Sequence, residues 1–509
     1  MIRVKVRTVL LMAIILVISG WVVYTQLPSI LYHNKQYDTL LRLYPEHRLA
    51  QQALYQSGMN AFDVHDDYNN YYFIFPDSKS WSGAVHDKAE LQEAEQKLKR
   101  LIANYNNSSS IVQAKYKLGI LYIQEKRWDE AEQQLKEVAA AQKPDVFFQT
   151  NELQGWLAML ETRHTDIGKT PLLEGTVTMD GKPAADAFVV LKDKALNGWV
   201  SNPFGNYPIA ITDAQGKYRF YGDGKGGEAA PKPAVLKGVG DYSVYPIEYE
   251  VGVGMTPAEL SGYYLGGTTP DSVTIRNGST AAYNINFVPQ MEIISPVNKT
   301  LIDGNQITFK WKPYPGAYSY QIQIINLQYD RSGRLIESYS SYYMDDLWKD
   351  AEATYSVSFL RTYLNGYSKS YDGKSVTLQP SSILGAVFPG GKFTWSVTAF
   401  TKEGKILSSS DGYYTGLQDK PLFQMPDDGQ LEGDRLVLQQ RYAEAIEAYK
   451  REGDNDFALR ALAVMALYGI AQEDNGNPAQ AIAYLERIKE PTVRDLRMLD
   501  EAREKLKQS

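Results

Sequence analysis

The chain has 509 residues, a net charge of −7 and no cysteine. This length allows about three or four domains, and the negative charge argues against a nucleic-acid partner, which requires a basic surface. The lack of cysteine excludes disulfides, thiolate catalysis and cysteine-bound zinc.

The N-terminus contains a predicted membrane anchor. Residues 1–7 include three basic side chains, and residues 8–25 contain no charged residue. The uncharged stretch is near the shortest length that spans a bilayer as a helix. Basic residues before it keep the N-terminus in the cytoplasm and place the bulk of the chain outside. The alternative is a signal peptide cleaved near Gly20, but Trp21–Val23 continue the apolar run, so we expect a retained single-pass anchor.

Residues 28–166 are predicted to form helices, because apolar side chains recur with the period of a helix and Gly and Pro are sparse. The clearest unit spans residues 111–138, where a polar turn separates two helical stretches. Gly119 and Ala131 are small, as expected where two helices cross closely. A larger side chain at either position would push the two backbones apart.

This unit resembles the tetratricopeptide repeat, in which a Leu-Gly pair is followed by Ala twelve residues after the Gly. The same spacing recurs in residues 427–509, at Gly433 and Ala445 and at Gly469 and Ala481. The resemblance implies two helical-repeat domains that bind a protein partner along an inner face. Gln113 and Tyr116 would belong to that face.

An aromatic-rich insertion interrupts the first helical segment at residues 63–83. The candidate partner-binding residues within it are Tyr71, Tyr72, Phe73, Phe75 and Trp81. Two arrangements remain open. The insertion is either a loop that exposes its aromatic side chains as an interface, or a local core that packs back onto the helices.

At Thr170 the pattern changes to the alternation of β-strands, with Gly, Pro and Asp at the turns. Residues 187–191 and a turn at 213–216 that leads into the next strand resemble the carboxypeptidase regulatory-like domain. The resemblance implies a small transthyretin-like β-sandwich at residues 171–289. It covers the accessory module only, because no histidine in the chain has Glu three residues later, as the zinc-ligand pair of a carboxypeptidase requires.

Residues 290–420 are predicted to form a second β-sandwich. Alternating apolar and polar residues at 307–311, 315–324 and 393–399 resemble a fibronectin type III-like or immunoglobulin-like module. Residues 326–389 lie between its two halves, and we expect them to form an elaborated hairpin and long loops.

No catalytic or metal site is predicted. All five histidines precede residue 165, so neither β module can assemble a Ser-His-Asp or Cys-His site. His65 and His86 have acidic neighbours, but without a metal-ligand spacing they are expected in a turn and at a helix start. We therefore expect a non-enzymatic protein with no cofactor and no metal.

The predicted fold is a multidomain α plus β chain, with an N-terminal transmembrane helix and tetratricopeptide-like helical segments that flank two β-sandwich modules. The predicted function is a membrane-anchored scaffold or adaptor outside the cytoplasm of a bacterium, which binds a protein partner through its helices. The alternative is a protein that binds carbohydrate or cell wall through aromatic residues on the sandwich modules. The location of exposed aromatic side chains, in a helical groove or on a sandwich face, discriminates between the two.

Overall fold

The computed structural model of the protein describes residues 25–508, except 61–71, 76–77, 82–87, 106, 142–149, 162, 164–169, 195–206, 223–234, 237–246, 268, 277–278, 330–334, 337–340, 345, 365–366, 368, 372–375, 413–419 and 473. The predicted anchor at residues 8–25 thus lies, but for Thr25, outside the described residues. Within the described ranges, no helix combines the length and apolar character needed to cross a membrane.

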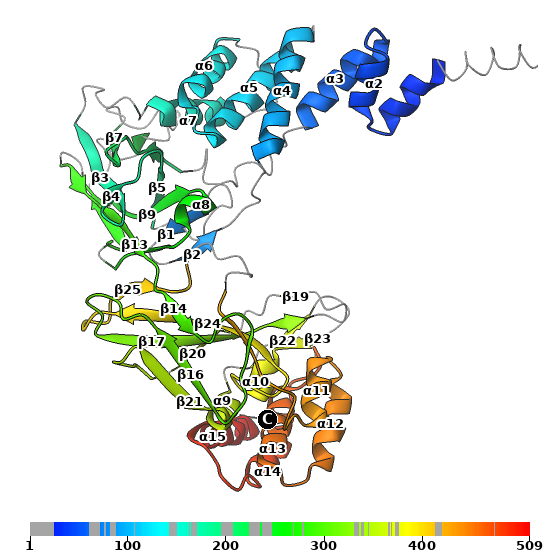
Figure 1. The fold of residues 1–509 in the computed structure, drawn as a ribbon, viewed down its shortest axis with the longest axis vertical. Helices are drawn as coiled ribbons and strands as arrows, with labels where there is room; N and C mark the ends of the chain where they lie inside the picture. The colour runs from blue at the N-terminus through cyan, green and yellow to red at the C-terminus, as the bar shows by residue number, and fades with distance from the viewer. Residues whose placement is uncertain are drawn as a thin grey trace, which may run out of the picture. The chain divides into compact units, whose positions relative to one another are not determined.

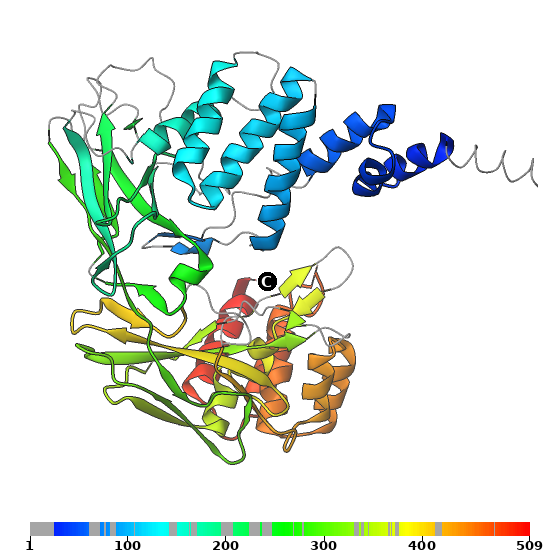
Figure 2. The same cartoon turned by 45° about the horizontal axis from the view of Figure 1, so that its top comes forward.

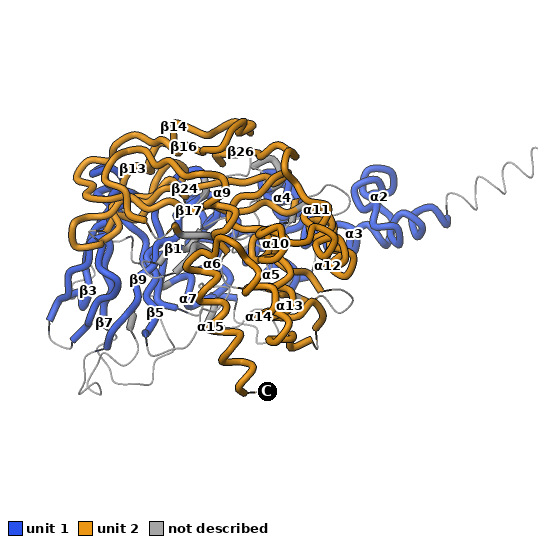
Figure 3. Tube along the Cα trace, turned by 90° about the horizontal axis from the view of Figure 1, so that it is seen from below, with its two compact units in different colours: residues 1–260, 269–287 blue, residues 261–268, 288–509 orange. Residues whose placement is uncertain are grey.

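The chain divides into two compact units, which Figure 3 distinguishes by colour. Unit 1 comprises residues 1–260 and 269–287, and unit 2 comprises residues 261–268 and 288–509. Each unit contains both helices and β-sheets (Figure 1), as the predicted α plus β class requires.

The helices of unit 1 occupy residues 25–33, α2 (Tyr37–Leu43), α3 (Arg48–Asn60), α4 (Lys88–Asn104), α5 (Ser108–Gln124), α6 (Trp128–Ala140), α7 (Thr150–Glu161) and the short α8 (Pro257–Leu260). Helices α4, α5 and α6 lie side by side in both Figure 1 and Figure 2. Helix α5 begins after Asn107, because the Asn107 side chain accepts hydrogen bonds from the backbone N–H groups of Ser109 and Ser110.

The predicted close crossing of two helices at Gly119 is confirmed. A Cβ placed on Gly119 of α5 would lie 2.8 Å from the Leu135 side chain of α6, which leaves no space for a larger residue. Ala131 is fully buried at the same helix pair.

The strands of unit 1 form two sheets. The first has the order β2-β1-β9-β5-β6, with β11 also paired to β9, and the second contains β13-β3-β7-β8, with β4 and β12 beside β3. Their bounds are β1 Tyr72–Phe75, β2 Ser78–Trp81, β3 Pro171–Met179, β4 Lys182–Pro183, β5 Phe188–Asp193, β6 Ile209–Ile211, β7 Lys217–Gly222, β8 Val235–Leu236, β9 Ile247–Met255, β11 Ser272–Ile275, β12 Ala281–Ala282 and β13 Ile285–Pro289.

Helices and sheet share one hydrophobic core in unit 1. Phe188 and Ile209 belong to the same buried cluster as the helices. The Trp128 ring meets Phe188 edge to face at 5.8 Å, and the Trp128 Nε1–H donates a hydrogen bond to Asp186 at 2.8 Å. Helix α6 is therefore held to β5 by apolar packing and by a satisfied indole.

The strands of unit 2 include a three-stranded sheet, β14-β16-β21, and a six-stranded sheet, β15-β26-β24-β17-β20 with β25 beside β24. The bounds are β10 Tyr263–Leu265, β14 Ile293–Ser295, β15 Thr300–Leu301, β16 Gln306–Trp311, β17 Ser319–Asn326, β18 Gln328–Tyr329, β19 Leu335–Ile336, β20 Ser341–Tyr343, β21 Glu352–Ser356, β22 Lys369–Tyr371, β23 Val376–Leu378, β24 Lys392–Phe400, β25 Ile406–Ser409 and β26 Leu422–Gln424. Phe309 on β16 and Trp395 on β24 join the two sheets, with ring centroids 4.8 Å apart.

The helices of unit 2 are α9 (Val357–Thr362), α10 (Pro380–Leu384), α11 (Glu432–Leu438), α12 (Tyr442–Arg451), α13 (Asp456–Tyr468), α14 (Pro478–Leu485) and α15 (Val493–Gln508). The prediction of long loops at residues 326–389 is wrong for much of that segment. The segment contains the hairpins β18–β19 and β22–β23, the strands β20 and β21, and the helices α9 and α10.

The two C-terminal Gly-to-Ala spacings have different structural causes. A Cβ on Gly433 would lie 2.4 Å from the Tyr449 ring, so α11 and α12 do cross closely there. Gly469 instead caps the C-terminus of α13 with a φ of +76°. Its positive φ favours Gly, so Gly469 acts as a helix cap and not as a small residue at a helix crossing.

The insertion between residues 357 and 384 docks on the C-terminal helices. The Arg361 guanidinium lies 2.5 Å from the Asp434 carboxylate, and both side chains are at least nine-tenths buried. Asp434 also accepts a hydrogen bond from the Tyr449 hydroxyl at 2.7 Å. Burial lowers the pKa of Arg361, against the opposing effect of Asp434. A buried ion pair thus links this insertion to α11 and α12.

We predict that Gly119→Leu destabilises the protein by about 1–3 kcal/mol, because the added side chain overpacks against Leu135. Ala139→Leu, at an exposed position of α6, is the matched control and should change stability by less than about 0.5 kcal/mol. Urea unfolding followed by circular dichroism measures both. Equal stability of the two variants would contradict the close crossing.

We also predict that Arg361→Met costs about 3–5 kcal/mol, because it leaves Asp434 as an uncompensated buried charge. Adding Asp434→Asn should recover part of that loss, since Asn is neutral. Arg451→Met removes an exposed pair with Glu432 and should cost less than about 1 kcal/mol. Chemical denaturation of unit 2 tests the series, and a double variant no more stable than Arg361→Met would argue against the ion pair.

Candidate functional site

The two inner-face residues predicted on α5 are engaged within unit 1. Tyr116 is 4% exposed, so the expectation that it lies on a face open to a partner is wrong. Gln113 is half-buried, and its Oε1 accepts a hydrogen bond from the Tyr55 hydroxyl at 2.9 Å. The Tyr55 ring stacks on Tyr105. This side of α5 therefore packs against α3.

The aromatic insertion forms a β-hairpin. Its candidate residues fall into two groups, with Tyr72, Phe73, Phe75 and Trp81 in β1 and β2 and Tyr71 outside the described residues. Strand β1 runs antiparallel to β9, with Ile74 opposite Val253, and Ile74 is 1% exposed. Neither an exposed loop nor a core packed on the helices describes this backbone, because the hairpin extends a sheet instead.

The C-terminal helices are partly covered by the insertion from their own unit. The Tyr367 ring stacks on Tyr468 at 4.7 Å. The Lys369 ammonium donates hydrogen bonds to the backbone oxygens of Tyr468, Ala471 and Asp474 at 2.8–3.3 Å. These carbonyls lie at the C-terminal end of α13 and just after it, where a cation is favourable. The repeat resemblance assigned such a helical surface to a partner, yet here the chain itself occupies it.

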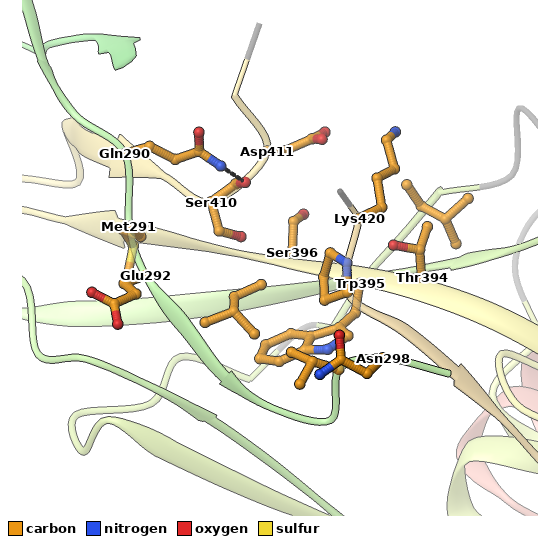
Figure 4. Close-up of a pocket in the computed structure, with 14 residues that line it drawn as sticks. Gln290, Met291, Glu292, Asn298, Thr394, Trp395, Ser396, Ser410, Asp411 and Lys420 are labelled. Atoms are coloured by element: carbon orange, nitrogen blue, oxygen red, sulfur yellow. Dashed lines mark hydrogen bonds between the residues drawn. The ribbon is translucent and has the colours of Figure 1, made fainter. Parts of the chain in front are cut away.

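A cavity of about 520 Å³ lies in the second β module. It is bounded by the residues around β14, by the outer side of β24 and by residues on both sides of the 413–419 segment. In Figure 4, Gln290 and Ser410 lie at one end, Ser396 lies near the middle, and Thr394 lies with Lys420 at the other end. The volume is within the range of small-molecule pockets.

Several polar groups of this cavity are fixed by hydrogen bonds. The Gln290 side-chain amide donates to the Ser410 carbonyl, as Figure 4 shows. The Ser410 hydroxyl accepts from the Val397 N–H at 2.8 Å, and the Ser396 hydroxyl donates to Gln323 at 3.1 Å. The positions of these groups are therefore set before any ligand arrives.

Thr394 differs from its neighbours. It is 2% exposed, and its Oγ1 has no hydrogen-bond partner among the described residues. Strand alternation explains its direction, because Phe393 and Trp395 point into the core and Thr394 points to the opposite side. An unpaired buried hydroxyl costs about 1–3 kcal/mol. Such a group at a cavity wall marks a position where a ligand or a water can complete the hydrogen bond.

The charges around the cavity balance. Glu292 forms an ion pair with Lys312 at 2.5 Å, and the other charged wall residues in the described part of the chain are Asp411 and Lys420, of opposite sign. The cavity therefore favours a neutral ligand over a strongly charged one.

Among the residues that the structure describes, none provides this cavity with an exposed aromatic ring for stacking. Its one aromatic wall residue, Trp395, is 1% exposed and donates its Nε1–H to the Pro296 carbonyl at 2.8 Å. Across the described part of the chain, the exposed aromatic side chains are Tyr318, Phe359 and Tyr371. All three belong to the second β module or its insertions, and none to the helical arrays, but they lie on separate elements.

Sequence reasoning missed this cavity. Polar residues alternate with the apolar ones of β24 at Thr394, Ser396 and Thr398, which indicates a polar sheet face. The pattern alone does not reveal that this face is buried. Among the residues that the structure describes, no three His, Cys, Asp or Glu side chains gather as metal ligands. No His or Cys lies after residue 165, so this module contains neither an imidazole nor a thiol.

Comparison with known proteins does not assign a family. No protein-family model matches the chain, and no curated protein matches it in sequence. The tetratricopeptide, regulatory-like and fibronectin type III-like resemblances are therefore not confirmed.

Solved structures similar to this chain include a DUF3823 family protein from Bacteroides ovatus, with 13% identity, 50% of this chain and 97% of that chain covered, and a TM-score of 0.15. Another is a DUF3823 family protein from Parabacteroides merdae, with 12% identity, coverage of 50% and 96%, and a TM-score of 0.16. TM-scores this low support no conclusion about the fold or function of this chain.

Proposed function

We propose that this protein is a non-catalytic binding protein and that the cavity beside β24 binds a neutral carbohydrate. The observation that carries the proposal is the buried hydroxyl of Thr394, which has no partner among the described residues and lies in a cavity where Gln290, Ser396 and Ser410 are already held in place. A ligand hydroxyl both donates and accepts hydrogen bonds, so it can pair with Thr394 whichever way the threonine hydroxyl points.

The remaining wall supports the same ligand class. Asn298 and Gln290 offer amide groups, and Met291, Ile293 and Pro421 supply apolar surface for the carbon face of a sugar ring. Ligand pockets combine apolar wall surface with placed polar groups, and both are present here. In this proposal the described wall recognises the ligand through hydrogen bonds and apolar contacts.

The location of the protein is part of the proposal. The uncharged stretch at residues 8–25 and the basic residues before it support a single-pass anchor with the two units outside the cytoplasm of a bacterium. Cell-wall glycans would then be the local source of carbohydrate.

The helical arrays are proposed as supports for the β modules, not as partner-binding surfaces. Trp128 joins α6 to β5, and Arg361 joins the insertion to α11. The residues that a partner would need on α5, Gln113 and Tyr116, are engaged within unit 1.

We predict that Thr394→Val weakens carbohydrate binding about tenfold while leaving the free protein as stable as before or more stable, since valine removes an unpaired buried hydroxyl. Titration calorimetry of the purified full-length protein with neutral oligosaccharides and soluble cell-wall glycan fragments, alongside thermal unfolding, measures both effects.

Thr398→Val is the matched control on the same side of β24. The Thr398 hydroxyl donates to Ser409, so its loss should lower stability slightly and leave binding unchanged. A protein that binds none of these glycans, or a Thr394→Val variant that binds them as well as the original, would refute the proposed ligand.

We predict that protease added to intact spheroplasts digests the protein and that carbonate washing leaves it in the membrane pellet. Both follow from an uncleaved N-terminal span with the residues after 27 outside. Release of a soluble product that lacks residues 1–20 would show cleavage instead.

A further inference from the structure

A second, smaller cavity of about 200 Å³ lies near the same end of the β17–β24 strand pair, where Asn326 pairs with Phe393 next to Ile325 and Thr394. Its wall includes Asn326 at the end of β17, Leu378 at the end of β23, Pro380 at the start of α10, and Val437 near the end of α11. The β module and the C-terminal helices of unit 2 therefore form this cavity together.

Asn326 supplies an unused hydrogen-bond acceptor to the cavity. The residue is 1% exposed, and its Nδ2 donates to the Lys392 carbonyl at 3.3 Å. Its Oδ1 has no donor among the described residues. The same Lys392 carbonyl also accepts from the Leu327 N–H at 2.8 Å, so it does not depend on Asn326. The unpaired amide oxygen carries a desolvation cost that a bound donor would remove.

The cavity around Asn326 is lined by both apolar and amide-bearing side chains. Leu378, Phe388 and Val437 are at most 1% exposed and line the cavity. The half-buried side chains of Gln328 and Gln440 also line it, and their amides carry N–H donors. A secondary amide that bears a methyl group complements this cavity. Its N–H can donate to the free acceptor, its carbonyl can accept from a nearby amide N–H, and its methyl group can pack on the apolar wall.

We propose that this cavity binds an acetamido group. The ligand N–H donates to Asn326 Oδ1, its carbonyl accepts from the side-chain amide of Gln328 or Gln440, and its methyl group packs on Leu378 and Phe388. The volume is below the usual range for drug-sized ligands, which suits one acetamido group rather than a whole oligosaccharide. This inference concerns a different cavity and does not rest on carbohydrate binding at Thr394.

The test uses the full-length protein and three probes in saturation-transfer NMR with titration. N-acetylglucosamine and N-acetyl-L-alanine carry the acetamido group, whereas glucose does not. We expect both acetamido probes to bind at this cavity and glucose to show no binding there, with the tighter acetamido probe identifying an amino sugar or an acetylated amino acid as the source. Asn326→Leu should weaken acetamido binding at least tenfold, and Thr394→Val should leave it unchanged.

Thermal unfolding first establishes that Asn326→Leu is folded. If it is not, Gln440→Met provides a second variant, which removes a donor near the surface and should also weaken binding. Three results would overturn the inference: no acetamido binding, binding that Asn326→Leu and Gln440→Met leave intact, or a crystal soaked in N-acetylglucosamine with only water beside Asn326. Acetamido binding lost in Thr394→Val but retained in Asn326→Leu would place the ligand in the larger cavity, which supports the proposed function and refutes this site.

Discussion

Burial of the helical arrays against the β modules is the constraint on which each unit depends. A short set of helices gains little stability by itself and must pack its apolar faces against another element. In unit 1 this role falls to Trp128, which packs on Phe188 and donates to Asp186. In unit 2 the core extends from Trp395 of the sandwich to Ala481 of the helices without interruption.

The same constraint removes surface that a free helical array would offer to a partner. The insertion at residues 357–384 lies on the C-terminal helices through Arg361, Tyr367 and Lys369, much as a bound peptide would. An intramolecular contact of this kind loses little additional entropy, because the covalent chain keeps the segment nearby. A partner would have to displace a buried ion pair to reach that surface.

The two cavities beside β24 depend on the rigidity that this packing provides. Strand β24 has its large side chains fixed in the core, so its polar side chains have fixed positions on the other face. Thr394 and Asn326 keep buried polar atoms unpaired at a cost in stability. Groups that lower the stability of the free protein and face a cavity are more often found at functional sites than elsewhere.

The sequence by itself determined the elements that local pattern controls. Helical periodicity predicted α5 and α6, and the small size of Gly119 predicted their close crossing. The alternation of apolar and polar residues predicted β16, β17 and β24. It also excluded cysteine chemistry and histidine chemistry in unit 2. These features follow from residues near one another in the chain, or from composition.

Only the tertiary structure decided which surfaces are covered and which groups face a cavity. Strand β1 pairs with β9 about 180 residues away, which no local pattern encodes. Gly433 and Gly469 share the same spacing to Ala, yet one is a helix crossing and the other a helix cap. Tyr116 has the position of an inner-face residue but is buried, and Thr394 resembles any polar strand residue until its burial is known. Burial and hydrogen-bond satisfaction depend on contacts between distant segments, and these contacts form only when the chain folds.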